Sequence, residues 1–353
     1  MKVLALTEGP DHVCYRYRIE AFTGALARRG GTLAALPLAP HTWPRNNQLR
    51  QAAGADVVVL QRKLLPLWQL RILRRAARRL VYDFDDALFC RDSYSLKGPQ
   101  SWTRMAHFWA TVYSADCVIA GNRFLWEQAG ELIDPRRVRL IPTSIDPGRY
   151  PMSRHLGVGV EAKLVWIGQS STLPCLDRAE RLLAAAAQRL PGLRMRVICD
   201  RFPDLQGVAI EQCHWSEATE AADLAAADIG VSWLPDDTWS QGKCGLKVLQ
   251  YMAAGLPVVA NAVGMNREMV RHGHNGLLAT TPGQWADAVS RLSRDPDLRR
   301  RMGAAGRELV EQRFHIEYWG ERFATLIDDV HRGHSSRAAP GMSGEEFAAS
   351  GAS

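Results

Sequence analysis

Several features that would narrow the function at once are missing from this sequence. It contains no run of about 18 apolar residues, which is evidence against a transmembrane helix, and its N-terminal segment MKVLALTEGP is too short an apolar run for a signal peptide. Its seven cysteines include no C-x-x-C pair, which argues against a disulfide framework or a zinc site and for a reducing compartment. Nucleic-acid-binding motifs are also absent. We therefore expect a cytoplasmic protein that binds no nucleic acid.

Length and composition favour a two-domain globular protein. The chain has 353 residues, of which 46% are apolar and 23% charged. Its net charge of +7 favours acidic partners, such as nucleotide diphosphates or anionic lipids. Residues 62–80 hold seven Arg or Lys residues and no acid, interleaved with Leu, Ile and Trp68. This segment is either an interfacial helix on an anionic membrane surface or a crossover helix that covers a sheet, and Pro66 shortens the helix in both cases.

Short apolar strands alternate with helical segments along two similar halves of the chain. This alternation is typical of βαβ units, in which crossover helices join parallel strands. We predict an α/β fold with two Rossmann-like, doubly wound parallel sheets and a linker near residues 142–161. Helices are expected over residues 16–29 and 315–331, among others. The expected strands are Val3–Leu6, Leu33–Leu36, Asp56–Leu60, Leu80–Phe84, Cys117–Ala120, Val138–Ile141, Lys163–Ile167, Arg194–Cys199, Ile229–Leu234 and Val258–Ala260.

The most informative stretch is residues 240–279. Lys243, Lys247 and Gln250 are spaced so that they share one face of a helix that is otherwise apolar. A short apolar strand follows, and Gly264 and Asn266 open the next helix. Ligands of open α/β sheets bind beyond the carboxyl ends of the strands, so two lysines there indicate a site for a phosphate or diphosphate. The alternative is that the lysines line a solvated helical face.

Polar residues also follow other predicted strands. Gly168, Ser170 and Ser171 end one strand, and their amides and hydroxyls can donate hydrogen bonds to an anion. A Gly-Ser turn is also a common simple connector. The run Tyr82-Asp83-Phe84-Asp85-Asp86 places three carboxylates within four residues, which is a pattern suited to a hard metal ion, although an Asp here can equally cap a turn.

The loop after the first strand contributes further candidates. Gly9 permits close approach to a ligand, and Arg16 and Arg18 follow it. Guanidinium groups at this place suit a phosphate or an acidic sugar. The alternative is that both arginines lie on a solvated first helical turn.

Residues 240–279 resemble the C-terminal signature of family-4, or group 1, glycosyltransferases, which have the GT-B fold. The family shows a Glu, Gly-Phe-Gly-Leu, a second Glu, Ala-Met-Ala-x-Gly-x-Pro-Val-Val, Gly-Gly-x-x-Glu and Asn-Gly-Leu-Leu. The matching segments here are Gly245-Leu246, residues 251–259, Gly264 with Glu268, and Asn275 to Leu278. The resemblance is strong over residues 160–280 and weak over 1–150.

The chain departs from this signature at its two glutamates. Gly242 and Gln250 stand in their places, and neither basic residue that the family uses on the donor diphosphate follows Gly168. The resemblance implies that the Gln250 amide contacts the donor ribose, and we infer that Lys243 and Lys247 supply the missing positive charge. It also implies that Gly168, Ser170, Ser171, Gly264, Asn266 and Glu268 bind the donor. Residues 213–216 fall where relatives place the nucleotide base.

In the first domain, the resemblance implies that Asp85 and Asp86 lie at the cleft, where Asp85 would touch the transferred sugar or the acceptor hydroxyl. Gly9, Arg16 and Arg18 are the other acceptor or cleft candidates. The two-domain layout fits the metal-independent GT-B type, so no metal ligands are assigned and the metal interpretation of these carboxylates is discounted. The loss of a carboxylate at Gly242 would leave Asp236 or Asp237 as substitutes.

As a whole, the resemblance implies a retaining glycosyltransferase that moves a sugar from a nucleotide diphosphate sugar to a hydroxyl of a glycan or lipid-linked glycan, with no cofactor. Residues 1–150 would form the acceptor domain and residues 151–314 the donor domain, with a helix at 315–331 crossing back to the first domain and a disordered tail at 332–353. The location would be cytoplasmic, and peripheral on the inner face of the membrane if residues 62–80 bind lipid. The alternative is a catalytically degenerate nucleotide-sugar binding protein on the same fold.

Overall fold

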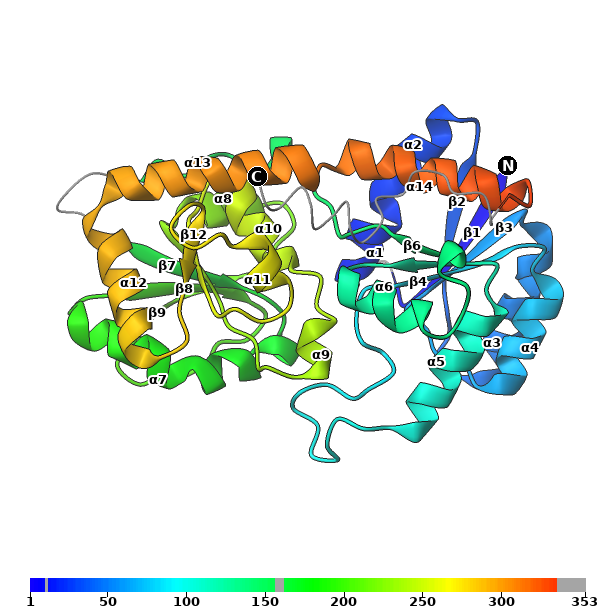
Figure 1. Cartoon of the computed structure of the whole chain (residues 1–353), viewed down its shortest axis with the longest axis horizontal. Helices are drawn as coiled ribbons and strands as arrows, with labels where there is room; N and C mark the ends of the chain where they lie inside the picture. The colour runs from blue at the N-terminus through cyan, green and yellow to red at the C-terminus, as the bar shows by residue number, and fades with distance from the viewer. Residues whose placement is uncertain (10–11, 156–161, 335–353) are drawn as a thin grey trace. The chain divides into compact units, whose positions relative to one another are not determined.

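A computed structural model describes residues 1–9, 12–155 and 162–334 of the chain, which divides into two compact units (Figure 1). The first unit contains residues 1–144, 237–244 and 316 onward, and the second contains residues 145–236 and 245–315. Our expected boundaries place residues 237–244 in the second domain, whereas their contacts place them in the first unit. Most of the expected disordered tail, from residue 335 on, lies outside the described residues.

The first unit is built on a six-stranded sheet in which every pair of neighbours is parallel. Its order is β2-β1-β3-β4-β5-β6, so the order reverses between β1 and β3. Every residue of β3, β4 and β5 is buried, as expected for parallel strands covered by helices on both faces. The strands are β1 (Lys2–Thr7), β2 (Thr32–Pro37), β3 (Val57–Gln61), β4 (Leu80–Phe84), β5 (Cys117–Ala120) and β6 (Val138–Leu140).

Helices cover both faces of this sheet. One face packs on α3 (Thr42–Arg50), α4 (Leu67–Ala76), α5 (Trp102–Ser114) and α6 (Arg123–Gly130), of which α3 was not predicted. The other face packs on η1 (Glu20–Phe22), α2 (Thr23–Arg28) and α14 (Ile316–His331). The single helix expected over residues 16–29 is wrong. Ile19, which is fully buried, leaves helical geometry and separates α1 (Val13–Arg18) from η1 and α2.

The basic segment 62–80 is mainly a crossover between β3 and β4. Its helix, α4, begins only after Pro66 and buries Leu70 and Leu73 against the sheet. The helix is therefore much shorter than the basic segment. Arg62 and Lys63 precede it, in the loop that follows β3. None of the described helices combines the length and the apolar character that crossing a bilayer requires.

The second unit is built on another six-stranded parallel sheet, with the order β12-β11-β10-β7-β8-β9. Numbered within the unit, this is the 3-2-1-4-5-6 order of nucleotide-binding Rossmann domains, which reverses between β7 and β10. The two doubly wound sheets confirm the predicted α/β class. The strands are β7 (Lys163–Ile167), β8 (Arg194–Cys199), β9 (Ala209–His214), β10 (Ile229–Ser232), β11 (Val258–Ala260) and β12 (Gly276–Leu278).

Two of these strands, β9 and β12, were not predicted. Both are edge strands, and β9 is exposed or half-buried along its whole length, so its sequence lacks the continuous apolar run of a central strand. The core of the unit lies between the sheet and its helices, with Trp166 and Trp285 among its buried side chains. The remaining helices of the described chain are α7 (Pro174–Arg189), α8 (Glu220–Ala225), α10 (Leu246–Ala253), α11 (Met265–Met269), α12 (Pro282–Arg294) and α13 (Pro296–Arg313) in this unit, and α9 (Thr238–Gln241) in the first unit.

Helix α14 completes the core of the first unit although it is distant in sequence. Trp319, Phe323 and Ile327 are buried on its inner face, and the Phe323 ring stacks on Phe22 with centroids 4.9 Å apart. Gly320 lets the helix approach closely, because a Cβ there would lie 3.1 Å from the Cβ of Ala25. The N-terminal sheet therefore depends on the C-terminal helix for one of its covering layers.

We expect Phe323→Ala to lower the free energy of unfolding of the first unit by about 3–5 kcal/mol, because it leaves a cavity beside Phe22. Native-state hydrogen exchange of the β1 and β3 amides would measure this loss unit by unit. Tyr318→Ala, at a 44% exposed position on the same helix, is the matched control and should change the exchange little. Equal effects of the two variants would contradict the packing described here.

Candidate functional site

The signature helix begins later than its sequence indicates. Helix α10 starts at Leu246, after Gly245 in the left-handed conformation with φ 71°. Lys243 therefore precedes the helix, and the prediction that it shares one helical face with Lys247 and Gln250 is wrong. A Cβ at position 245 would lie 2.7 Å from the sulfur of Met269, so close packing and a turn, invisible in the helical spacing, set this boundary.

Lys247 lies at the carboxyl end of β7, beside the point where the strand order of the second sheet reverses. Its Nζ is 4.1 Å from the ring centroid of Trp166 and donates a hydrogen bond of 3.2 Å to Thr172 Oγ1. Gly168 makes room for the ammonium group, since a Cβ there would lie 2.8 Å from Nζ and would also clash with the Trp166 ring. The cation is thus held in place before any ligand arrives.

The turn after β7 carries both predicted serines. Ser170 and Ser171 lie in η5 (Ser170–Thr172), and Ser171 is exposed. The Ser170 amide donates to Asp200 Oδ1 at 2.8 Å, and hydrogen bonding by Ser170 lowers the pKa of the Asp200 carboxyl to about 2. Asp200, which follows β8, therefore competes with a ligand for the Ser170 amide.

Gln250 lies inside the second unit and is only 4% exposed. Its Nε2 donates to the Tyr150 hydroxyl at 3.4 Å, which in turn donates to Glu220 Oε1 at 3.4 Å. The other carboxylate oxygen of Glu220 accepts 2.7 Å from the indole N–H of Trp215, a residue of the segment expected near the nucleotide base. A hydrogen-bonded chain thus joins Gln250 to Trp215, and the ribose contact of Gln250 stays a prediction.

The predicted residues around α11 divide into buried and exposed ones. Gly264 precedes the helix with φ 50° and ψ −134°, and Glu268 is exposed. Asn266 is 1% exposed, and its Oδ1 accepts 3.1 Å from the Ser232 hydroxyl. Asn261 bonds both the amide and the carbonyl of Leu234. The two asparagines thus tie the ends of β10 and β11 together, a role that the sequence motif does not reveal.

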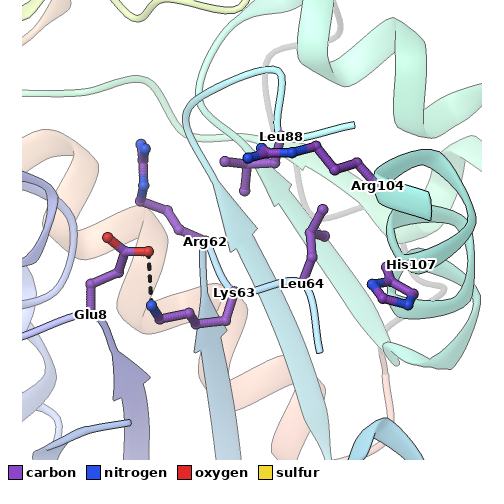
Figure 2. A pocket seen from close by; sticks show the side chains of 7 residues that line it. All are labelled: Glu8, Arg62, Lys63, Leu64, Leu88, Arg104 and His107. Carbon is purple, nitrogen blue, oxygen red and sulfur yellow. Dashed lines mark ion pairs between the residues drawn. The ribbon is translucent and has the colours of Figure 1, made fainter. Parts of the chain in front are cut away.

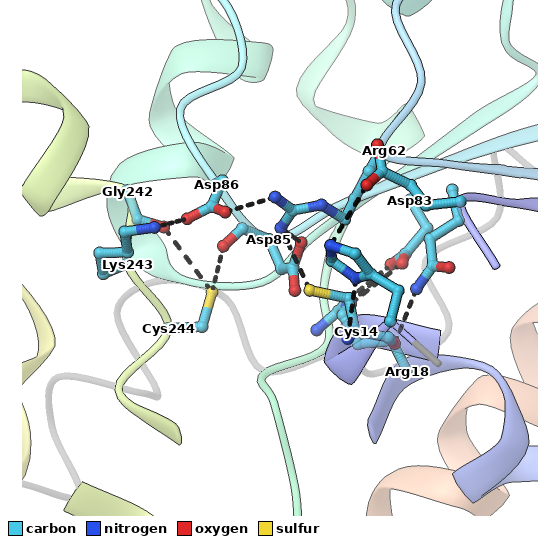
Figure 3. A network of polar contacts seen from close by, with 12 residues as sticks. Cys14, Arg18, Arg62, Asp83, Asp85, Asp86, Gly242, Lys243 and Cys244 are labelled. Carbon is cyan, nitrogen blue, oxygen red and sulfur yellow. Dashed lines mark hydrogen bonds and ion pairs between the residues drawn. The ribbon is translucent and has the colours of Figure 1, made fainter. Parts of the chain in front are cut away.

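In the first unit, the three predicted carboxylates are all paired with cations (Figure 3). Asp83 accepts two hydrogen bonds of 3.1 and 3.0 Å from Nε of Arg18, which is 1% exposed and also donates to the Ile141 carbonyl. The prediction that Arg18 binds a ligand and the alternative of a solvated helical turn are both wrong. A buried Asp83 requires a buried partner, and Arg18 is that partner.

Arg62 and Lys243 pair with the other two carboxylates. Arg62 contacts Asp85 and lies 2.6 Å from Asp86 Oδ2, while Lys243 Nζ lies 2.9 Å from Asp86 Oδ1 and 4.5 Å from the Trp239 ring centroid. Burial opposes ionisation of Asp85, but the charges of Arg62 and Arg18 and the hydrogen bonds from Cys14 and Arg62 together outweigh it and lower the pKa of Asp85 to about 2. Burial likewise opposes the charge on Lys243, and Asp86 raises its pKa. Among the described residues, no group of three or more His, Cys, Asp or Glu side chains could hold a metal ion.

Hydrogen bonds hold residues 237–244 against this cluster of ion pairs. Asn122 Nδ2 donates to the carbonyls of Gln241 and Lys243 at 3.0 and 3.1 Å, and the Cys244 thiol donates to the Asp85 carbonyl at 3.2 Å. At position 242 a Cβ would lie 2.5 Å from the amide nitrogen of Ala87 and 2.7 Å from its Cβ. The backbone leaves no space for the family's glutamate.

Asp237, one of the two suggested substitutes for that glutamate, has a structural role. Its Oδ1 accepts 2.9 Å from the Ser240 amide, which caps α9, and 3.1 Å from the Ser93 hydroxyl. Its carboxylate is thus already engaged within the first unit.

A pocket of about 310 Å³ lies at the carboxyl edge of the first sheet, beside the reversal between β1 and β3 (Figure 2). Lys63 Nζ lies 3.0 Å from Glu8 Oε1 in this pocket, and Arg62 adopts the strained left-handed conformation with φ 58°. Its lining was not predicted from the sequence, because residues 62 and 63 were grouped with the basic helix. Both residues directly follow a strand, and ligands of open α/β sheets bind beyond the carboxyl ends of the strands. The pocket is lined by Glu8, Arg62, Lys63, Leu64, Leu88, Arg104 and His107.

Two acceptor candidates do not line this pocket. Gly9 directly follows Glu8, and open space surrounds the position of a Cβ there. The Arg16 guanidinium lies 5.0 Å from the ring centroid of Tyr17. A ligand contact of either residue stays a prediction.

The pKa of Asp85 generates a prediction for acid conditions. Its folded pKa lies below the value of an unfolded Asp, so its ion pair stabilises the protein above about pH 4, and this contribution is lost as the pH falls toward 2. The loss is on the order of 2 kcal/mol. Urea unfolding between pH 5 and 2, compared between the wild type and Asp85→Asn, measures it; the variant should show a shallower pH dependence. Asp92→Asn, at an exposed acid of the same unit, should keep the wild-type slope.

The packing at position 242 predicts that restoring the family residue is harmful. We expect Gly242→Glu to destabilise the protein by about 1–3 kcal/mol, because overpacking against the Ala87 backbone forces the two segments apart. Gly283→Glu, where a Cβ meets nothing within 4 Å, is the control. Thermal unfolding of both variants decides the matter, and a Gly242→Glu protein as stable as the wild type would refute the close approach.

Comparisons with known proteins agree with this architecture. The family described as "Glycosyl transferases group 1" matches residues 232–309. The D-inositol 3-phosphate glycosyltransferase of Actinosynnema mirum is 31% identical over 227 residues, which are 53% of this chain and 51% of that protein. The N-acetyl-alpha-D-glucosaminyl L-malate synthase of Bacillus anthracis is 36% identical over 91 residues, or 25% of this chain and 24% of that protein. The chain thus spans about half the length, or less, of these curated relatives.

Solved structures share the fold at low identity. Sucrose-phosphate synthase from Thermosynechococcus elongatus aligns with a TM-score of 0.73 and 18% identity, covering 94% of this chain and 100% of that one. Anabaena HepE, solved in complex with UDP and glucose, aligns with a TM-score of 0.70 and 17% identity over 93% of this chain and 100% of that one. The resemblance to the group 1 glycosyltransferases with the GT-B fold, predicted from residues 240–279, is thereby confirmed.

Proposed function

We propose that this chain is a retaining glycosyltransferase that moves a sugar from a nucleotide diphosphate sugar to a hydroxyl acceptor. The observation that carries the proposal is the position of Lys247. Its ammonium group lies at the carboxyl end of β7, at the reversal of strand order where such sheets bind nucleotides, and within the residues that match the glycosyltransferase family.

In this proposal the second unit binds the donor. Lys247 holds the diphosphate and stabilises the negative charge that develops on it as the bond to the sugar breaks. Because Trp166 and Thr172 already fix the ammonium group, little reorganisation is needed in the transition state. The backbone around Gly168 and the hydroxyls of Ser170 and Ser171 add hydrogen bonds, and Gln250 contacts the ribose. The UDP complexes of the structural neighbour HepE support this class of donor.

The role of Lys243 in this proposal differs from the diphosphate contact that its spacing in the sequence suggested. Its ammonium group pairs with Asp86, so it positions that carboxylate instead of neutralising the diphosphate. Asp85, with a pKa of about 2, is a weak base at neutral pH. We therefore assign removal of the acceptor proton to an oxygen of the leaving phosphate, which is on the same face of the sugar and is consistent with retention.

The acceptor is assigned to the pocket of the first unit. Arg62, Lys63, Arg104 and Glu8 line it; Arg62 pairs with Asp85 and Asp86, and Lys63 pairs with Glu8. Arg104, which donates to the Cys90 carbonyl, is then the cation that meets a negative group of the acceptor, such as the phosphate of a phosphate-linked glycan. Two of the matched relatives are named for D-inositol 3-phosphate and L-malate, which are both anionic hydroxyl compounds.

The test is thermal stabilisation of the full chain by UDP, GDP, ADP and CMP. A ligand at 100 times its Kd should add about 2.7 kcal/mol of stability to the wild type. Lys247→Ala should lose most of this response, because the diphosphate loses its cation. Lys163→Ala removes the same side chain from the opposite end of β7, where it pairs with Glu211, and should keep the response.

The outcomes separate the alternatives. A diphosphate that stabilises the wild type but not Lys247→Ala supports the site and identifies the donor class. No response to any nucleotide, or an equal response of both proteins, would overturn it. Binding without turnover of the matching nucleotide sugar would instead indicate a degenerate nucleotide-sugar binding protein.

A further inference from the structure

Helix α5 presents an aromatic stripe to solvent. Trp102, Trp109 and Tyr113 are 85%, 47% and 65% exposed, and their spacing of seven and four residues puts them on one helical face. An adjacent face of the helix is normal core, with Phe108 and Val112 fully buried. The exposed aromatics are therefore not required by the packing of the helix.

The neighbouring helices also expose tryptophan side chains. Helix α4 packs between α3 and α5, and Figure 1 draws the three helices next to one another. Trp43 on α3 is 81% exposed, and Trp68 on α4 is 47% exposed. Of the ten large hydrophobic residues that are exposed in the described part of the chain, seven fall within residues 43–113. We call this surface the aromatic face; its members are Trp43, Leu67, Trp68, Leu96, Trp102, Trp109 and Tyr113.

The same three helices carry charge of one sign only. They contain no Asp or Glu and six arginines: Arg45, Arg50, Arg71, Arg74, Arg75 and Arg104. Helix α14, on the other face of the sheet, has four acids and one arginine. Arg71 and Arg75 are exposed beside Trp68, whereas Arg74 pairs with Asp116. Arg71 and Arg75 thus make the part of the aromatic face around Trp68 complementary to a negatively charged surface.

We propose that the aromatic face binds an anionic lipid bilayer, with α5 lying along the membrane surface. Indole and phenol rings prefer the interface, where their apolar part meets lipid and their polar atom stays hydrated. Arginines without neighbouring carboxylates add attraction to anionic headgroups. The membrane contact is therefore made by α3, α4 and α5 together, and not by residues 62–80 alone, because most basic residues of that segment pair with acids of the protein. This inference is independent of the proposed sugar transfer.

The contribution of the arginines to lipid binding is tested by sedimentation of the full chain with vesicles. We expect binding to phosphatidylcholine vesicles that contain one third phosphatidylglycerol, weak binding to pure phosphatidylcholine, and a decrease with salt. Arg71→Glu with Arg75→Glu should weaken binding at least about tenfold. Arg291→Glu with Arg294→Glu makes the same charge change at exposed positions of α12 and should leave binding unchanged.

The aromatic contribution is tested with Trp102→Ser and Trp109→Ser together. This variant should lose vesicle binding and the quenching of tryptophan fluorescence by brominated lipids, while circular dichroism shows an intact fold. Tyr318→Ser, at an exposed aromatic on α14, should behave like the wild type. Absence of wild-type binding, or equal binding to both vesicle types, would overturn the proposal. So would a dimer in sedimentation velocity that the double tryptophan variant dissociates, since the face would then be a protein interface.

Discussion

The pairing of three carboxylates with three cations at the end of β4 is the interaction on which the first unit's site depends. Asp83, Asp85 and Asp86 are each less than 10% exposed, so each needs a compensating charge. Arg18 comes from α1, Arg62 from the loop after β3, and Lys243 from a segment far along the chain. One cluster thus fixes the first helix, the wall of the pocket and the position of residues 237–244. The strained backbone of Arg62 fits this arrangement, because two ion pairs hold the side chain where the pocket needs it.

The second unit fixes its cation by packing. Lys247 has an aromatic ring and a hydroxyl among its neighbours, and both orient its ammonium group. This arrangement requires a glycine at position 168, because any side chain there would displace the lysine. The contrast with Lys243 separates two lysines that look equivalent in sequence. Lys243 is paired with the Asp86 carboxylate, whereas the Lys247 ammonium group lies over the indole ring of Trp166.

The sequence was sufficient to predict the strands of the two sheets, but it did not reveal which polar side chains pair with one another. Apolar runs such as Leu80–Phe84 and Lys163–Ile167 coincide with strands to the residue, because central parallel strands are buried on both faces. The prediction that Lys243 shares a helical face with Lys247 was wrong, because the left-handed turn at Gly245 depends on packing against Met269. Arg18 was misassigned because its partner Asp83 lies 65 positions away. The pocket escaped notice for the same reason, since its lining comes from the residue after β1, the loops after β3 and β4, and α5, and only the strand order brings these together.

The missing signature glutamates can be understood from the same contacts. A glutamate at position 242 is excluded by the Ala87 backbone, and Asp237 is held by the Ser240 amide and the Ser93 hydroxyl. Residues 237–244 therefore present a lysine, and no glutamate, at their end. Gln250 replaces the second glutamate with a neutral amide, and it lies on the same helix as Lys247. A carboxylate at position 250 would lower the local positive potential, and it would face Glu220 across the Tyr150 hydroxyl, an unfavourable pairing of buried like charges. The neutral amide keeps the hydrogen bond and avoids that repulsion, so both departures from the family signature fit the contacts around positions 242 and 250.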